Sequence, residues 1–298
     1  MVPTTTLPTT LPTTQPTTRP STQPITQPGT PPMTPPIYQL HRGHTPLLVS
    51  LPHVGTFIPD ALKALLVDRA LALEDTDWHL APIYDFAKNL GASLIVPSHS
   101  RYVIDLNRPP ENTPMYPGTN NTELCPTRFF TGDALYRAGC APSPAQVIER
   151  RASYWQPYHD ALAAELARLK AAHGHALLWD GHSIRSRLPW LFDDQLPELN
   201  LGTANASSCA PSLRHALMQV LAWQTTFSQV TDGRFKGGYI TRQYGRPADG
   251  VHAVQLEKCW SCYMDEAPPW VLAAQRVAAL TPVLQALLQT LLDWQPDA

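Results

Sequence analysis

Short apolar runs alternate with amphipathic stretches along the chain from about residue 45 onward. Apolar runs that end in turn residues are typical of buried strands, and we find such strand patterns at 46–52, 92–97, 176–179, 238–242 and 252–257. Apolar residues spaced three or four apart predict helices at 60–66, 77–90, 143–173, 212–223 and 268–294. This order predicts an α/β fold in three layers, with helices on both faces of a central sheet.

The segments between these elements carry weaker signals. Residues 101–107 alternate between apolar and polar side chains, as a strand with one buried face does. The stretches 109–130 and 189–208 are rich in turn residues and are expected to be loops. Within the long helix at 143–173, Pro157 predicts an interruption, and Gly174 is placed to end the helix.

Residues 1–36 differ from the rest of the chain in composition. They hold 11 Pro and 13 Thr, and Arg19 carries their only side-chain charge. A segment with so little apolar surface to bury cannot offset the entropy lost on ordering, so we expect a disordered tail at 1–36. The remaining 262 residues, 37–298, are enough for a single large domain.

Charge and composition exclude several classes of protein. Residues 37–298 contain 21 Lys and Arg against 24 Asp and Glu, without the clustered basic excess of a nucleic-acid binder. No run approaches the roughly 18 apolar residues of a membrane span. The five scattered cysteines argue against a disulfide framework and favour reduced thiols in a cytoplasm. We expect a cytoplasmic protein with a small-molecule substrate; the sequence carries no sign of its oligomeric state.

Polar residues follow three of the apolar strands. His53 comes after the first, His182 after the run at 176–179, and Glu257 ends the last. In open α/β sheets this edge is where ligands bind, and glycines near both histidines allow close backbone approach. Two imidazoles and one carboxylate are a common set of zinc ligands, with Glu257 left for proton transfer. Asp75 and Asp77 both precede a helix, so either can supply the carboxylate, and the other is expected to cap that helix.

Several arginines lie in or just after these same segments. Guanidinium groups bind carboxylates through paired hydrogen bonds, so the arginines together with the histidines indicate a metal site for an anionic substrate. The alternative is that each arginine pairs with a nearby acid, as Arg101 can with Asp105. These arginines are Arg101, Arg108, Arg185, Arg242 and Arg246.

A series of motifs resembles the N-formylglutamate deformylase (N-formylglutamate amidohydrolase) family of histidine degradation. The matching stretches run in order from about residue 47 to 266, and the 1–36 segment has no counterpart in them. They are SLPHVGTFIP, DTDWHLAPIYDF, SRYVIDLNRPP, YWQPYHDAL, WDGHSIRSRLP, LNLGTA, GRFKGGYITRQYG, VHAVQLE and YMDE.

The resemblance implies a single catalytic domain at 37–298 with the three-layer αβα fold and central mixed sheet of the zinc carboxypeptidases (phosphorylase/hydrolase-like). It implies one zinc ion on His53, His182 and an acid of the DTDWH stretch. Zinc peptidases of that wider group place the acid three residues after the first histidine, where this chain has Thr56. Asp77 matches better than Asp75, although the motif itself leaves both open.

The resemblance also implies a reaction and the residues that carry it out. The reaction is hydrolysis of N-formyl-L-glutamate to formate and L-glutamate. Glu257 matches the general acid/base of the group, and substrate-carboxylate contacts are expected from Arg101, Asn107 and Arg108. Arg185 and Arg242 join them because a substrate with two carboxylates needs several cations. The alternatives are a metal-dependent amidohydrolase or deacylase for another N-acyl amino acid, a carboxypeptidase-like peptidase, and a non-catalytic binding protein.

Overall fold

Among the residues that the computed structural model describes (1, 3, 35–115 and 117–296), seven strands form one mixed sheet. The strands are β1 (Tyr38–His41), β2 (Leu47–Ser50), β3 (Ser93–Pro97), β4 (Ala176–Ile184), β5 (Leu199–Gly202), β6 (Gln229–Thr231) and β7 (Val251–Cys259). Their order across the sheet is β1-β3-β2-β4-β7-β5-β6. The four central strands are parallel, whereas β1 pairs antiparallel with β3 and β5 antiparallel with β7.

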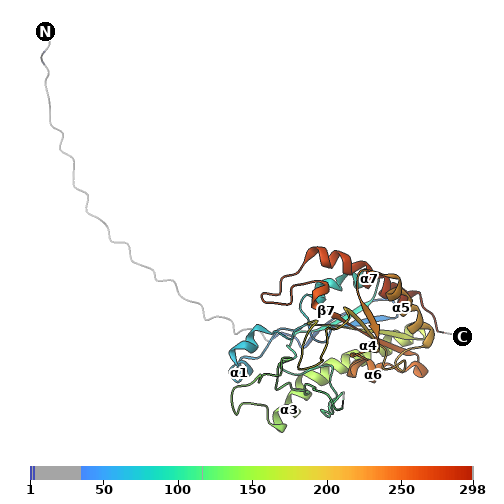
Figure 1. Ribbon diagram of the computed structural model, residues 1–298, viewed down its shortest axis with the longest axis horizontal. Helices are drawn as coiled ribbons and strands as arrows, with labels where there is room; N and C mark the ends of the chain where they lie inside the picture. Colours follow the sequence, from blue (N-terminus) through green and yellow to red (C-terminus); the bar gives the residue numbers. More distant parts are fainter. Residues whose placement is uncertain (2, 4–34, 116, 297–298) are drawn as a thin grey trace. The chain divides into compact units, whose positions relative to one another are not determined.

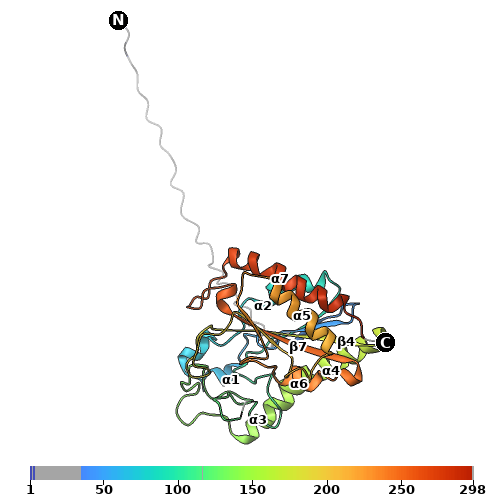
Figure 2. The same ribbon diagram turned by 45° about the vertical axis from the view of Figure 1, so that its right-hand side comes forward.

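Helices cover both faces of this sheet. Figures 1 and 2 show α5 and α7 on one side and α4 and α6 on the other, so the predicted three layers are present. The α-helices are α1 (Asp60–Lys63), α2 (Leu80–Ile83), α3 (Pro144–Arg150), α4 (Gln156–His173), α5 (Pro211–Trp223), α6 (Tyr239–Tyr244) and α7 (Ala274–Asp293). Shorter turns of 3₁₀-helix lie at Asp68–Ala72, Asp85–Lys88, Pro247–Asp249 and Trp260–Cys262. By length and hydropathy, none of the described helices could cross a membrane.

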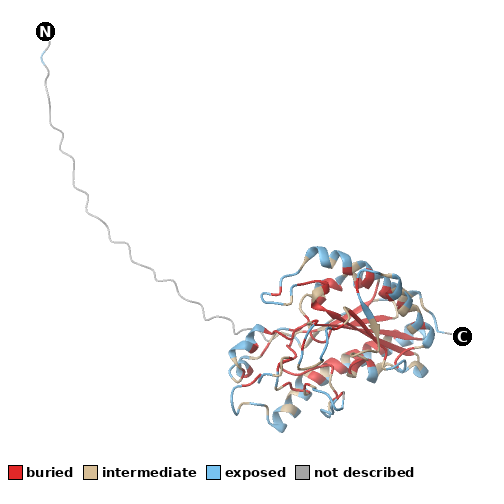
Figure 3. Ribbon diagram, viewed as in Figure 1, coloured by how far each residue is buried: buried red, intermediate tan, exposed pale blue. Residues whose placement is uncertain are grey.

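Alternate residues of a strand pack into two separate cores, one on each side of the sheet. Leu47 and Val49 belong to the core beneath α5 and α7, whereas Leu48 between them joins the core beneath α4. Every residue of β2, β4 and β7 is buried (Figure 3). Strands buried on both faces are near-continuous apolar runs, which explains why the sequence revealed them.

Contacts divide the chain into residues 1–34 and 35–298, and the sheet lies in the second unit. The disordered tail expected at 1–36 falls mainly on residues 2 and 4–34, which lie outside the described residues, and it stays a prediction. All five cysteines are free, and four of them are buried.

The long helical segment at 143–173 is interrupted where the sequence indicated. A π-helical turn, Arg151–Trp155, separates α3 from α4 and lies just before Pro157. Proline lacks the N–H group that would continue the hydrogen-bond pattern, so the helix widens next to it. Gly174 follows α4 with φ of 80°, a left-handed conformation that glycine adopts without strain, and ends the helix.

The single helix expected at 77–90 is wrong. The structure has only the short helix α2 and a 3₁₀ turn at Asp85–Lys88, with Tyr84 between them in a non-helical conformation. Two local features explain the break. The Asp77 N–H donates to the carbonyl of His53 at 3.0 Å, and His79 has φ of 64°, so the chain cannot enter a helix before Leu80.

The strands expected at 238–242 and 101–107 are also wrong. Residues 238–242 lie largely in α6, whose first turn is anchored because the N–H of Ile240 donates to Asn107 Oδ1 at 2.8 Å. Residues 101–107 form turns and coil with every side chain buried, so their alternation does not mark a solvent-facing side. Strands β1, β5 and β6 were not expected, and each has four residues or fewer.

Candidate active site

The three polar residues expected at one edge of the sheet do lie together there. Strands β2, β4 and β7 are neighbours and run parallel, so their carboxyl ends coincide. His53 follows β2, whereas His182 and Glu257 lie inside β4 and β7, which are longer than predicted. His182 and Glu257 are register partners on adjacent strands. The backbone approaches closely beside His53, since a Cβ added to Gly55 would lie 2.1 Å from the carbonyl oxygen of His99.

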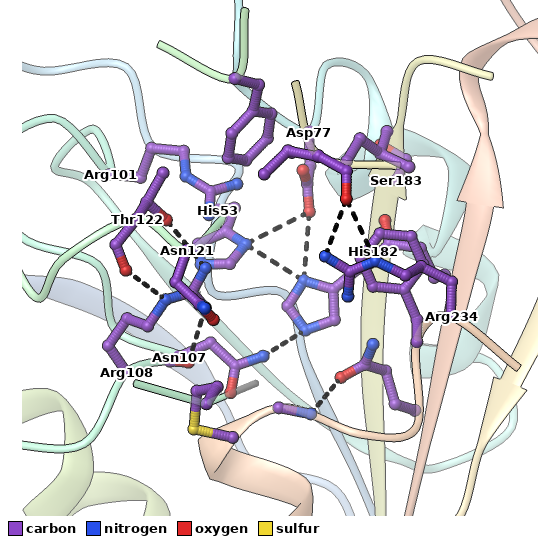
Figure 4. Close-up of a pocket in the computed structure, with 18 of the residues that line it drawn as sticks. His53, Asp77, Arg101, Asn107, Arg108, Asn121, Thr122, His182, Ser183 and Arg234 are labelled. Carbon is purple, nitrogen blue, oxygen red and sulfur yellow. Dashed lines mark hydrogen bonds and ion pairs between the residues drawn. The ribbon is translucent and has the colours of Figure 1, made fainter. Parts of the chain in front are cut away.

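His53, Asp77 and His182 form a buried group that could hold a metal ion. The two Nδ1 atoms lie 3.1 Å apart, and Asp77 Oδ2 lies 3.7 Å from His53 Nδ1 and 3.4 Å from His182 Nδ1 (Figure 4). Asp77 Oδ2 has no hydrogen-bond partner within the described part of the chain. An unpartnered buried carboxylate oxygen facing two imidazoles is suited to a divalent cation.

A second carboxylate lies close to the Nε2 atom of each imidazole, on the side away from Asp77. His53 Nε2 lies 2.8 Å from Asp105 Oδ1, and His182 Nε2 lies 3.1 Å from Asp180 Oδ2. With its proton on Nε2 and Asp105 accepting it, His53 presents the Nδ1 lone pair toward Asp77. Carboxylates in this position fix the ring orientation and tautomer of metal-binding histidines.

The charges around the two imidazoles differ. Burial, helped by the nearby positive charge of Arg101, lowers the pKa of His53. Burial opposes the charged form of His182 too, but the carboxylates of Asp180 and Asp77 outweigh it and raise its pKa to about 10. The negative surroundings therefore favour a positive charge at this point, which a metal ion would provide.

Asp75 is engaged elsewhere. Its Oδ2 accepts hydrogen bonds from the Tyr102 hydroxyl at 2.9 Å and from the Phe130 N–H at 3.1 Å. Burial raises its pKa to about 6. Asp75 therefore anchors the loop that contains Phe130, and neither it nor Asp77 makes a side-chain cap for α2.

Replacing each aspartate by asparagine tests this division. We expect Asp77→Asn to abolish stoichiometric metal binding, because the amide removes an anionic ligand from the centre. Asp75→Asn should keep the metal and instead lower the melting temperature, because a buried hydrogen-bond acceptor is altered. Elemental analysis of both purified variants beside the parent protein checks this. A metal-free Asp75→Asn protein together with a fully loaded Asp77→Asn protein would reverse the assignment.

Glu257 lies in the wall of the same pocket. Burial raises the pKa of its carboxyl group to about 7, and the negative charge of Asp77 acts in the same direction. A carboxyl group with a pKa near neutrality can both accept and return a proton, which is what a general acid/base requires. The adjacent Lys258 is fully buried and donates to the carbonyl of His182 at 2.7 Å, which holds β4 against β7.

Of the five residues expected to contact substrate, three line the pocket: Arg101, Asn107 and Arg108. Arg101 donates to Asp105 Oδ2 at 2.6 Å, so the acid pairing considered from the sequence is present. Arg108 donates to the side-chain and backbone oxygens of Thr122. The Asn107 amide lies 2.9 Å from His182 Nε2, on the opposite side of that ring from the metal-binding group.

Arg185 and Arg242 are not among the residues that line the pocket. The Arg185 guanidinium lies over the ring of Trp260, and its Nη2 is 4.0 Å from Glu74 Oε2. Arg242 is exposed on α6, and its Nε donates to the carbonyl of Gly237 at 2.9 Å. A strand at 238–242 would have carried Arg242 to the sheet edge; the helix found there does not.

Several residues of this site were not expected from the sequence. Asp180 could have been found, because it lies two residues before His182 on the same strand and therefore faces the same side. Asp105 was considered only as a partner of Arg101. Arg234 lines the pocket from the GRFKGGYITRQYG stretch, a motif that could have pointed to it. Asn121 and Thr122 line the pocket from the 109–130 loop, which has no regular pattern.

Solved structures share this fold. The crystal structure of N-formylglutamate amidohydrolase from Ralstonia eutropha JMP134 superposes with a TM-score of 0.67 at 24% identity, covering 85% of this chain and 97% of that one. A gene product of Agrobacterium tumefaciens superposes with a TM-score of 0.66 at 18% identity, covering 86% and 94%. At these identities the likeness concerns the fold.

Sequence comparison is more specific. The chain is 50% identical over 258 residues to N-formylglutamate deformylase of Pseudomonas aeruginosa, covering 87% of this chain and 97% of that protein. The corresponding figures for N-formylglutamate deformylase of Pseudomonas putida are 48%, 87% and 96%. Residues 45–264 match the model of the N-formylglutamate amidohydrolase family. The resemblance drawn from the sequence motifs is confirmed, and the chain belongs to the N-formylglutamate amidohydrolase family.

Proposed function

We propose that this protein is a zinc-dependent enzyme that hydrolyses N-formyl-L-glutamate to L-glutamate and formate, as a step of histidine degradation. The observation that carries the proposal is the buried group of His53, Asp77 and His182 beside Glu257, in a pocket lined by arginines. Relatives about half identical in sequence and named for this activity support the choice of substrate. The kinship with zinc carboxypeptidases stays a prediction.

The donor set fits zinc. Two imidazole nitrogens and one carboxylate leave a fourth position open, as in catalytic zinc sites, and the carboxylates of Asp105 and Asp180 keep both rings oriented. When bound, zinc supplies a Lewis acid that polarises a carbonyl oxygen and makes water acidic. Hard cations such as Mg²⁺ prefer oxygen ligands, so a site with two nitrogens favours zinc over them.

Glu257 is the proposed general acid/base. It accepts a proton from the water that attacks the formyl carbon, and it returns that proton to the nitrogen of glutamate as the C–N bond breaks. The proton that water loses is thus the one that the leaving amine gains. A carboxyl group with a pKa raised to about 7 by burial is suited to both steps.

Arg101 and Arg108 are the proposed contacts for the carboxylate next to the reacting bond. Both line the pocket, and Arg101 lies near enough to Asp77 for its charge to lower the pKa of that acid. Asn107 contributes by holding His182 and the first turn of α6. We do not assign Arg185 or Arg242 to substrate, because both lie outside the pocket lining.

The decisive experiment measures formate release by zinc-loaded protein from a panel of N-acyl amino acids. We expect N-formyl-L-glutamate to be the best substrate. N-formylglutamine and N-formylmethionine should be roughly 10–100-fold poorer in kcat/KM, because each loses a charge-assisted contact. N-acetylglutamate carries a methyl group where the formyl compound has a hydrogen, so it tests how large an acyl group the pocket accepts. Equal kcat/KM for N-formylmethionine and N-formylglutamate would favour a general N-acyl amino acid amidohydrolase, and absence of formate release would refute the proposal.

A further inference from the structure

The loop between β6 and α6 carries Arg234, which lies in the GRFKGGYITRQYG stretch but was not among the residues expected to contact substrate. Arg234 lines the pocket that contains His53 and His182. In Figure 4 its side chain and that of Arg108 lie on opposite sides of the His182 ring. At the start of this loop, Asp232 is bound to Arg214 at 3.0 Å.

The backbone around Arg234 is held by contacts with β7 and with the end of β5. The N–H of Ala204, just beyond β5, donates to the carbonyl of Lys236 at 2.6 Å, and the N–H of Gly238 donates to Gln255 Oε1 on β7 at 2.7 Å. The approach to β5 is so close that a Cβ added to Gly202 would lie 2.6 Å from the nitrogen of Gly237. The loop position is therefore set before any ligand arrives.

The Arg234 side chain is also oriented in advance. Its Nε and Nη2 donate to the carbonyl of Leu191, at 3.3 and 3.1 Å, and its guanidinium lies 5.3 Å from the centre of the Phe235 ring. Leu191 and Phe235 line the pocket as well. A guanidinium held in place loses little conformational entropy on binding an anion, and its fork geometry suits a carboxylate.

Arg234 and Arg101 differ in depth. Arg101 is buried and paired with Asp105, directly behind His53. Arg234 is only half-buried and thus nearer to solvent. In N-formylglutamate one carboxylate is attached to the carbon that bears the formylated nitrogen, and the other lies at the far end of the side chain. With the formyl group at the metal-binding residues, an extended substrate would place its far carboxylate toward the outer part of the pocket.

We propose that Arg234 binds the side-chain carboxylate of the substrate and so determines the preference for a dicarboxylic acid. This assignment rests on the proposed function, and it adds a residue and a role that the family match does not supply. It divides the arginines by position: Arg101 and Arg108 serve the carboxylate beside the reacting bond, and Arg234 serves the distant one.

The test compares Arg234→Met with the parent protein on two substrates. For N-formyl-L-glutamate we expect kcat/KM to fall about 10–100-fold. Most of this loss should come from a higher KM, because the missing contact stabilises the bound substrate and the transition state equally. For N-formyl-L-glutamine, which lacks the distant charge, kcat/KM should change by less than about twofold. Arg234→Lys should recover part of the lost kcat/KM, since lysine restores the positive charge but not the paired N–H groups of the guanidinium. Arg187→Met, at an exposed arginine bonded to Gln195, is the matched control and should leave both substrates unchanged.

Calorimetric binding of the product separates this inference from the proposed function. L-glutamate should bind Arg234→Met about 10–100-fold more weakly than the parent protein, and L-glutamine should bind both alike. A parent protein that binds L-glutamate in this Arg234-dependent way but releases no formate would refute the proposed function alone. Equal losses on the charged and uncharged ligands, or no loss on either, would overturn the role of Arg234, because a merely structural contribution affects both.

Discussion

Glu257→Gln is expected to lower turnover of N-formyl-L-glutamate by roughly 10²–10⁴-fold while the protein keeps its metal. The amide has nearly the shape of the carboxyl group, so β7 and its pairing with β4 should persist. What disappears is the ability to take a proton from water and return it to the leaving amine. Because Glu257 is proposed to move protons without holding the metal, turnover and metal content should separate in this variant.

Three measurements check this expectation together: kcat, zinc content and melting temperature. Glu149→Gln removes a carboxylate from an exposed position on α3 and should match the parent protein in all three. If Glu257→Gln lost its zinc along with its activity, Glu257 would belong to the metal-binding group. If it kept more than about a tenth of the parent turnover, another group would be the acid/base, since a general base is worth at least ~10²-fold.

The central part of the fold could be predicted because it is buried on both faces. Strands β2 and β3 are apolar at nearly every position, and that pattern has few alternatives. The segments around the site were mispredicted for a different reason. Residues 77–79 and 101–107 are shaped by hydrogen bonds to distant partners, such as Asp77 N–H to His53, which local periodicity does not record.

The same distinction applies to the candidate site. His53, His182 and Glu257 follow from strand ends, because parallel strands bring their carboxyl ends to one edge. The choice of Asp77 over Asp75 needed the structure, since it depends on Tyr102 and Phe130 engaging Asp75 from elsewhere in the chain. Arginines were the least predictable residues, because their long side chains reach sites that their sequence neighbours do not.

His182→Ala is expected to abolish stoichiometric zinc binding and, with it, formate release. The change removes one of the two imidazole ligands and leaves the carboxylates of Asp77 and Asp180 buried without the ring that both face. Two remaining ligands, His53 and Asp77, are fewer than the three protein ligands typical of catalytic zinc sites. Elemental analysis, with formate release measured at rising zinc concentration, tests this, and a fully loaded His182→Ala protein would refute the ligand assignment.

Asp180→Asn provides the graded comparison for His182→Ala. It leaves the ligand in place and removes only the carboxylate that lies 3.1 Å from His182 Nε2. Such a change typically costs about 10–100-fold in metal affinity, so Asp180→Asn should regain activity when zinc is added, whereas His182→Ala should not. Activity in Asp180→Asn that no zinc concentration restores would mean that Asp180 does more than orient the ring. Rescue of both variants alike would mean that His182 is not an indispensable zinc ligand.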